Sequence, residues 1–236
     1  MTGLADLKVK IFADGADLDS MTAMYRNPLI KGFTTNPTLM RKDGVTDYES
    51  FAREVIAAIP DRPVSFEVFA DEADEMERQA REIASWGDNV NVKIPVTNTK
   101  GAFMGDLINR LSASGVVLNV TAIMTLDQVR WVADSLDAVT AAIVSVFAGR
   151  IADTGIDPIL VMAEAVDILK DKPKKRASLG QPAGAFEHLP RRSGRLSHHH
   201  RHPRRSQETG SGREEPGRLF PRHRQDVLQR RRKRRV

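Results

Sequence analysis

The chain has 236 residues, contains no cysteine and carries a formal net charge of +5 at pH 7. The length suits one large domain or two small ones, and the lack of cysteine excludes a disulfide framework and a thiolate metal site. No apolar run approaches membrane-spanning length and the N-terminus lacks a signal-peptide pattern, so we expect a soluble cytoplasmic protein.

The net charge conceals two regions of opposite sign. Residues 1–170 hold 16 Lys and Arg against 25 Asp and Glu, a net charge of −9. Residues 171–236 hold 20 against 6, a net charge of +14, and contain all six histidines. This change in composition predicts a boundary near Lys172, and we divide the chain into residues 1–174 and 175–236.

Within the first region, short apolar runs alternate with amphipathic stretches. The runs predict strands at Val9–Ala13, Ile30–Thr34, Val64–Ala70, Val90–Val96, Val116–Thr121 and Ala142–Phe147. The stretches between them predict helices at Asp47–Ile59, Glu72–Trp86, Ala102–Leu111, after the capping box Thr125-x-x-Gln128, and from Asp157-Pro158 onward. The spacing Thr46-x-x-Glu49 predicts a second capping box, at the start of the first of these helices.

Six βα units in succession imply a parallel sheet with right-handed crossovers. Such a sheet either stays open and doubly wound or curls into a (β/α)8 barrel of the TIM type. The first strand is followed by Asp14-Gly15-Ala16-Asp17 rather than by a glycine-rich phosphate loop. This counts against the dinucleotide-binding alternative.

Polar side chains near the strand ends favour the barrel. On each strand they have the parity opposite to the aliphatic residues, so they face away from the helices. In a barrel such residues converge at one mouth, where active sites of this fold are built. The residues on this inner face are Lys10, Phe12 and Asp14, then Glu67, Lys93, Asn119 and Thr121, and finally Ser145 and Phe147.

Lys93 is the most informative of these residues. It lies in the middle of a strand whose other face is aliphatic, and burial of an ammonium disfavours its charged form. A neutral amine can attack a carbonyl carbon, whereas a lysine that reaches out to solvent would have only a structural role. Asp14 before Gly15 could equally stabilise a turn, and Asn119 and Thr121 could satisfy each other.

Together these residues can carry out one kind of chemistry. Lys93 would add to a ketone, Glu67 would shuttle protons as water leaves, and the resulting iminium would let a neighbouring C–C bond break. Asp14 would take the proton from the hydroxyl at that bond. Asn119 would hold substrate hydroxyls, Thr121 could orient a water molecule, and Ser145 with Arg150 suits a phosphate.

Three motifs resemble the transaldolase family over roughly residues 7–174. They are Gly32–Thr38 with its Thr-Thr-Asn-Pro sequence, Val92–Thr97 around Lys93, and Ser145–Asp153. The resemblance implies a (β/α)8 barrel and transfer of a dihydroxyacetone unit between sugar phosphates, with no metal or organic cofactor. It also implies that Lys93 forms the Schiff base and that Asp14 and Glu67 are the acid–base residues. By the same resemblance the remaining residues of the site are Thr35, Asn36, Asn119, Thr121, Ser145, Phe147 and Arg150.

Fructose 6-phosphate aldolases are close relatives and form the alternative. They carry glutamine where this chain has Glu67, which favours the transferase.

The region 175–236 does not supply the two βα units that the resemblance requires. Its Arg- and His-rich composition is typical of a solvated disordered tail, of a nucleic-acid-binding arm or, at His198–His200 and His202, of a metal tract. We favour an out-of-frame translation. When GC-rich codons for Arg176–Val236 are read one nucleotide later, they can encode a strand, a helix, the apolar strand RIITVT and another helix, similar to the family's C-terminal part.

This hypothesis predicts an incomplete barrel of about six βα units. The first and sixth strands would be unpaired edges, half of the phosphate site would be lost, and the chain would be unstable and poorly active. The expected partners are sugar phosphates, with no membrane, and with nucleic acid only through non-specific attraction to the basic tail. The sequence neither requires nor excludes a homo-oligomer.

Overall fold

The structure is a computed structural model that describes residues 10–35, 40, 47–170 and 175–179. The chain divides into two units, Met1–Ala185 and Phe186–Val236, and every described residue belongs to the first. Asn36, Thr46 and the histidines of the tail lie outside the described residues. In the described part of the chain, no helix is both long enough and apolar enough to cross a bilayer.

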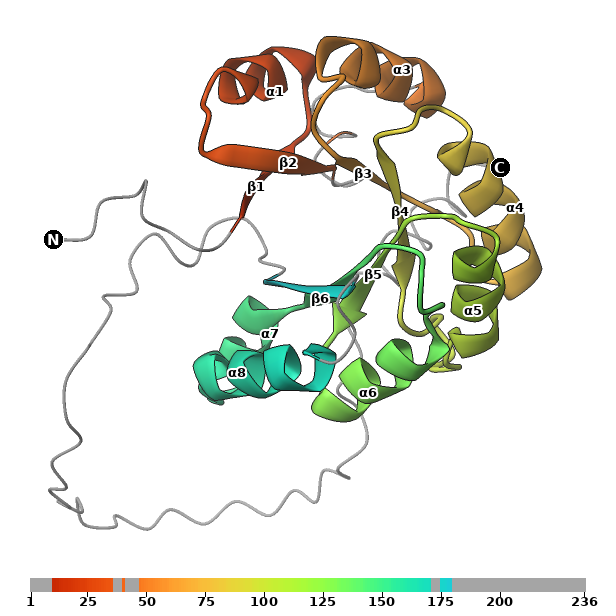
Figure 1. The fold of residues 1–236 in the computed structure, drawn as a ribbon, viewed down its shortest axis with the longest axis vertical. Coiled ribbons are helices and arrows are strands. Elements are labelled where there is room, and N and C mark those ends of the chain that lie inside the picture. The colour runs from red at the N-terminus through yellow and green to blue at the C-terminus, as the bar shows by residue number, and fades with distance from the viewer. Residues whose placement is uncertain (1–9, 36–39, 41–46, 171–174, 180–236) are drawn as a thin grey trace, which may run out of the picture. The chain divides into compact units, whose positions relative to one another are not determined.

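The first unit is a parallel sheet with its helices on the outer side (Figure 1). Each strand pairs with the next strand along the chain, in the order β1 to β7. The strands are β1 Ile11–Gly15, β2 Ile30–Thr35, β3 Val64–Glu67, β4 Val90–Pro95, β5 Leu118–Ile123, β6 Ala142–Val146 and β7 Lys175–Leu179. The helices are α1 Leu18–Tyr25, α3 Tyr48–Ala58, α4 Ala73–Ala84, α5 Gly105–Ala113, α6 Leu126–Ser135, α7 Ala148–Asp153 and α8 Pro158–Leu169.

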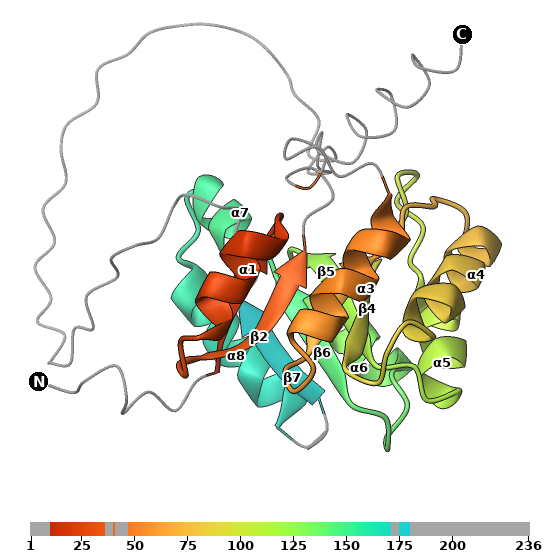
Figure 2. The same ribbon diagram turned by 90° about the horizontal axis from the view of Figure 1, so that it is seen from above.

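The strand order confirms a curled, incomplete α/β barrel. In a barrel every strand is hydrogen-bonded to its neighbours in the chain, whereas a doubly wound sheet reverses its strand order. In the described residues the order never reverses, and the sheet ends at β1 on one side and at β7 on the other. Figure 2, turned by 90° from Figure 1, shows α1, α3, α4 and α5 along the outside of the strands.

The seventh strand corrects the sequence analysis. We expected no strand after residue 174, yet Lys175–Leu179 pairs in parallel with all five residues of β6. A lysine and an arginine interrupt the apolar pattern there, which is why periodicity gave no signal. The expectation that the sixth strand would be an edge is therefore wrong, and β7 takes that position.

Local sequence explains most of the helix boundaries. The capping box at Thr125 and Gln128 is present, and Pro158 occupies the first turn of α8. The predicted helix Asp47–Ile59 is confirmed as α3, with Asp47 and Ile59 as its caps. The cap is not the predicted capping box at Thr46, because Asp47 is the N-cap and its carboxylate accepts the backbone N–H of Ser50. Helices α1 and α7 were not predicted, because they have only eight and six residues, too few to establish a period.

The core lies between the sheet and the helices. The outward-facing residues of β4 are fully or almost fully buried at Val90, Val92 and Ile94, as the period-two pattern predicted. Apolar faces of the helices cover them, for example through Met76 and Ile83 of α4. The polar residues of the strands are left on the inner face.

Candidate active site

Lys93 lies on the inner face of the sheet, where the sequence predicted it. Its side chain is only 14 % exposed, and its Nζ lies 3.4 Å from Oε2 of Glu67, which is 26 % exposed. The two residues are paired across β3 and β4, so their side chains leave the sheet on the same side. Lys93 Nζ also donates to the backbone carbonyl of Thr35 at the end of β2, at 3.0 Å.

The backbone of Glu67 is held by a tyrosine. The hydroxyl of Tyr48, from the first turn of α3, accepts the N–H of Glu67 at 2.7 Å and donates to its carbonyl oxygen at 3.3 Å. The Tyr48 ring makes edge-to-face contacts with Phe66, Phe69 and Trp86. Burial raises the pKa of Tyr48 above its ordinary value, so the hydroxyl remains protonated and can donate.

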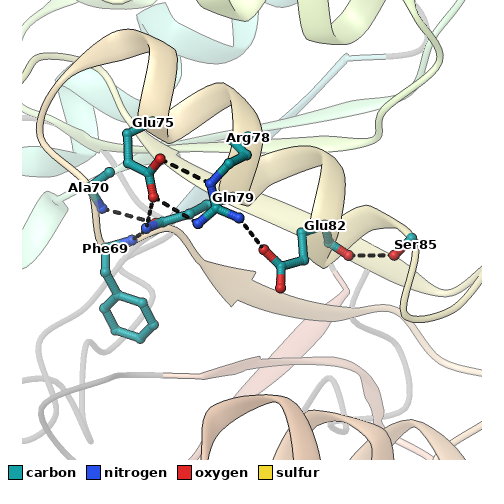
Figure 3. Close-up of polar contacts among 7 residues, drawn as sticks. All are labelled: Phe69, Ala70, Glu75, Arg78, Gln79, Glu82 and Ser85. Atoms are coloured by element: carbon teal, nitrogen blue, oxygen red, sulfur yellow. Dashed lines mark hydrogen bonds and ion pairs between the residues drawn. The ribbon is translucent and has the colours of Figure 1, made fainter.

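The residues after Glu67 are held by a glutamine. We predicted a strand to Ala70, but β3 ends at Glu67. Gln79 of α4 accepts the backbone N–H groups of Phe69 and Ala70 at 2.8 and 3.0 Å, and these bonds take the place of a ladder (Figure 3). The same figure shows Arg78 between Glu75 and Glu82, and the amide nitrogen of Gln79 donates to Glu75 at 3.2 Å. Side chains of α3 and α4 therefore determine the path of the chain at Glu67.

A buried hydrogen-bond chain crosses the sheet below Lys93. Ser145 of β6 donates to the amide oxygen of Asn119 at 2.7 Å, and the amide nitrogen of Asn119 donates to the hydroxyl of Ser65 at 3.1 Å. All three side chains are buried. Asn119 stands opposite Lys93 in the register, so this chain forms a rigid polar floor beside the amine.

Asp14 lies at the exposed end of β1. Its carboxylate accepts a hydrogen bond from the hydroxyl of Thr34, the residue opposite it on β2. Asp14 and Thr34 therefore share the inner face, as parity predicted. The exposed carboxylate can act as a base toward a bound ligand only if the ligand extends from Lys93 to β1.

Thr121 lies on the inner face next to a backbone irregularity. It is buried and stands opposite Pro95, two residues beyond Asn119. The next residue, Ala122, has φ of 62°, and the register between β5 and β6 shifts between Val120 and Ile123. Alanine at a positive φ is strained, and a register shift of this kind changes the direction of the neighbouring side chain.

Phe147 and Arg150 belong to the start of α7. Phe147 is half-buried at the N-cap, and its N–H donates to the carbonyl of Ile123. Arg150 is exposed and forms an ion pair with Asp153 at 3.5 Å. Among the residues that the structure describes, no hydrogen bond or ion pair joins Phe147 or Arg150 to the cluster around Lys93. Within the same residues, no group of three or more His, Cys, Asp or Glu side chains could hold a metal ion.

Comparison with known proteins gives the same assignment as the motifs. The family described as Transaldolase/Fructose-6-phosphate aldolase matches residues 11–183, which is most of the chain and includes β7. The chain belongs to this family. The match runs past residue 174, where the sequence analysis placed its boundary.

Three curated relatives of this transaldolase-family chain are each named probable transaldolase. A probable transaldolase of Dehalococcoides mccartyi is 38 % identical over 164 residues, covering 69 % of this chain and 72 % of the relative. Those of Streptococcus equi subsp. zooepidemicus and Roseiflexus sp. are 37 % and 36 % identical over 163 and 162 residues. The first of these two matches covers 68 % of this chain and 71 % of the relative, and the second covers 69 % and 70 %.

The sequence analysis missed two residues of this candidate site. Ser65 shares the parity of Glu67, so the rule that selected Glu67 could have selected it as well. Tyr48 gave no such signal, because a tyrosine on a predicted amphipathic helix is usually part of the core. Its contact with Glu67 depends on the packing of α3 against β3, which no local pattern specifies.

Proposed function

We propose that this chain transfers a dihydroxyacetone unit between sugar phosphates through a Schiff base on Lys93. The observation that carries the proposal is an amine only 14 % exposed, on the inner face of a parallel sheet, with a carboxylate 3.4 Å away. Family membership supports sugar-phosphate chemistry of this type.

In the proposed mechanism the neutral amine of Lys93 adds to the ketone carbon of the donor, giving a carbinolamine. Glu67 supplies the proton with which the hydroxyl leaves as water, and an iminium forms. Asp14 then takes the proton of the hydroxyl at the bond to be cut, an aldehyde leaves, and the electron pair of the C–C bond becomes an enamine on Lys93. Addition of the enamine to an acceptor aldehyde and hydrolysis reverse these steps.

The polar floor would orient the donor. The amide oxygen and the amide nitrogen of Asn119 each have one hydrogen bond to a serine and can each form another. Asn119 can therefore bind a substrate hydroxyl without breaking the hydrogen bonds to Ser65 and Ser145. In this proposal Thr121 orients the catalytic water, Asn36 and Phe147 line the donor site, and Ser145 and Arg150 contribute to the phosphate site. The sequence also predicted Thr35 as a binding residue, but its buried hydroxyl donates to the carbonyl of Ser65, so only its backbone carbonyl reaches Lys93.

Trapping with borohydride tests the mechanism. The full chain is incubated with fructose 6-phosphate, reduced and digested, and the peptides are weighed by mass spectrometry. We expect a mass gain on the peptide that contains Lys93. No adduct at substrate saturation would contradict the proposal.

The alternative within the family is aldol cleavage of fructose 6-phosphate without an acceptor, because the family description includes that activity. We propose the transferase, on the ground that Glu67 is a carboxylate. Coupled assays with and without erythrose 4-phosphate separate the two. Turnover that requires the acceptor supports the transferase, and equal turnover without it supports the lyase.

We further propose that the C-terminal region is out of frame and that this lowers stability and activity. Sequencing the gene around the codons for Lys174–Arg176 tests the frame. A single uninterrupted frame with no such shifted peptide would end that idea. A cooperative melt together with normal sugar-phosphate turnover would refute the predicted loss of activity.

A further inference from the structure

The ladder between β2 and β3 stops before Glu67, the residue of β3 that stands opposite Lys93. The last paired residues are Thr34 and Ser65, and the ladder begins with the N–H of Phe33 donating to Pro63. In a regular parallel ladder the next bond on β3 would run from the N–H of Glu67 to the carbonyl of Thr35. That bond is replaced in the structure by two others.

The donor and the acceptor of the missing bond each have another partner. The N–H of Glu67 donates to the Tyr48 hydroxyl at 2.7 Å, and the carbonyl of Thr35 accepts from Lys93 Nζ at 3.0 Å. The Tyr48 hydroxyl therefore accepts the N–H that the Thr35 carbonyl would accept in a regular ladder. The Thr35 carbonyl accepts from Lys93 instead. A buried N–H without a partner is costly, so a substituted site would tend to restore the bond to Thr35.

We propose that Tyr48 is a positioning residue for the reaction at Lys93, because its hydroxyl keeps the Glu67–Thr35 ladder bond open and thereby fixes Glu67 and the amine together. This inference rests on the proposed function of Lys93. Without the Tyr48 hydroxyl, the N–H of Glu67 competes with Lys93 for the Thr35 carbonyl, and the separation of amine and carboxylate changes.

The packing around Tyr48 makes its hydroxyl a fixed point. Its ring centroid lies 4.8 Å from that of Phe69 and 5.6 Å from that of Trp86, both in edge-to-face geometry. Asp47, the residue before it, caps α3 through Ser50. A ring held on several sides has little freedom to move its hydroxyl. The hydroxyl therefore fixes the position of the Glu67 backbone that is bonded to it.

The variant that tests this is Tyr48→Phe, which removes the hydroxyl and keeps the ring. Trp86→Phe is the matched control, because Trp86 contacts the Tyr48 and Phe66 rings but is not hydrogen-bonded to Glu67 in the structure. The measurement is the rate constant for formation of the borohydride-trapped Lys93 adduct at several fructose 6-phosphate concentrations. A rate constant, unlike an amplitude, does not depend on the fraction of protein that is folded.

We expect Tyr48→Phe to lower the saturating rate constant about 10- to 100-fold, with the half-saturating concentration within about threefold of wild type. Trp86→Phe should stay within about threefold in both. The rate loss is expected to arise from the changed separation of amine and carboxylate. Glu67→Gln has no carboxylate, so adding Tyr48→Phe to it should slow that variant by less than about threefold.

The outcomes are distinguishable. A wild-type chain without an adduct would overturn the proposed function and this inference together. A wild-type adduct with Tyr48→Phe no slower than Trp86→Phe, or with the full effect repeated in the Glu67→Gln background, would overturn the role of Tyr48 alone.

Discussion

The sheet has one region whose polar groups are tied together and another whose apolar surface is left open. Around β3 to β6, Tyr48, Gln79 and Asn119 each form two or more hydrogen bonds, and among the described residues no buried side-chain nitrogen or oxygen lacks a partner. Around α8, by contrast, large apolar side chains face solvent. The comparison teaches that the polar groups around Lys93 are fully paired, although the fold leaves apolar surface uncovered at α8.

Helix α8 shows the difference within one element. Ala165 and Leu169 are buried toward the sheet, whereas Ile159 and Val166 are 56 % and 53 % exposed and lie on one face seven residues apart. Glu164, on a different side of the helix, pairs with Arg130 of α6. The exposed stripe therefore lies away from α6, on the side where the helix of a further βα unit would pack in a barrel.

The largest effect should separate the two faces of α8. Leu169→Ala should lower the free energy of unfolding by about 3 kcal/mol, because it leaves a cavity against the sheet. Leu160→Ala should change it by less than about 0.5 kcal/mol, because Leu160 is 71 % exposed. Urea unfolding measures both, and equal losses would mean that something covers Leu160.

The exposed stripe of Ile159 and Val166 can test the reading frame. In this chain, Val166→Lys should change the free energy of unfolding by less than about 0.5 kcal/mol. In a chain with the shifted frame restored, the same substitution should cost about 2 kcal/mol or more, because a helix would then cover Val166. An identical small cost in both chains would count against the missing helix.

The polar floor should show a somewhat smaller effect. Asn119→Ala leaves the buried hydroxyls of Ser65 and Ser145 without their amide partner, and we expect a loss of about 2 to 3 kcal/mol in urea. The matched control is Asn109→Ala, whose amide bonds the carbonyl of Ser135 at the surface. If the two variants lose equal stability, the floor is not the rigid element that we describe.

The smallest effect is electrostatic and depends on pH. Hydrogen bonds from Arg81, and then from Arg110, lower the pKa of Glu77 below its ordinary value of 4.5. A lowered pKa stabilises the fold above that ordinary value, and the contribution is lost as pH falls through the lower folded pKa. Glu77→Gln should therefore cost about 0.5 to 1 kcal/mol at pH 7 and progressively less below about pH 4.5.

Thermal melts of wild type and Glu77→Gln between pH 3 and pH 7 measure this difference, and Glu54→Gln at an exposed position of α3 is the control. A gap between wild type and Glu77→Gln that stayed constant across this range would show that the two arginines contribute nothing through the charge of Glu77.

Alternation along the strands predicted much of the site, because parity is a local property. It put Lys93, Glu67, Asn119 and Ser145 on one face, and the register and the hydrogen bonds confirm that arrangement. Parity does not say where a strand ends. The end of β3 at Glu67 depends on Tyr48 and Gln79, which come from elsewhere in the sequence.

The fold was predictable to a similar degree and failed for similar reasons. Six strands follow apolar runs, whereas the edge strand β7 has the sequence Lys-Arg-Ala-Ser-Leu and forms because β6 offers it a complete partner. Short helices such as α7 contain too few residues for a period. The catalytic and binding roles of all these residues stay predictions. Asp14 and Arg150 are bonded in the described structure to Thr34 and Asp153, and not to the cluster around Lys93.

The most direct test of the central claim compares two lysines. Lys93→Met removes the inner amine, whereas Lys100→Met removes an exposed one that pairs with Glu72. After incubation with fructose 6-phosphate and borohydride, intact mass spectrometry should show the sugar adduct on wild type and Lys100→Met and none on Lys93→Met. An adduct of equal yield on Lys93→Met would contradict the account.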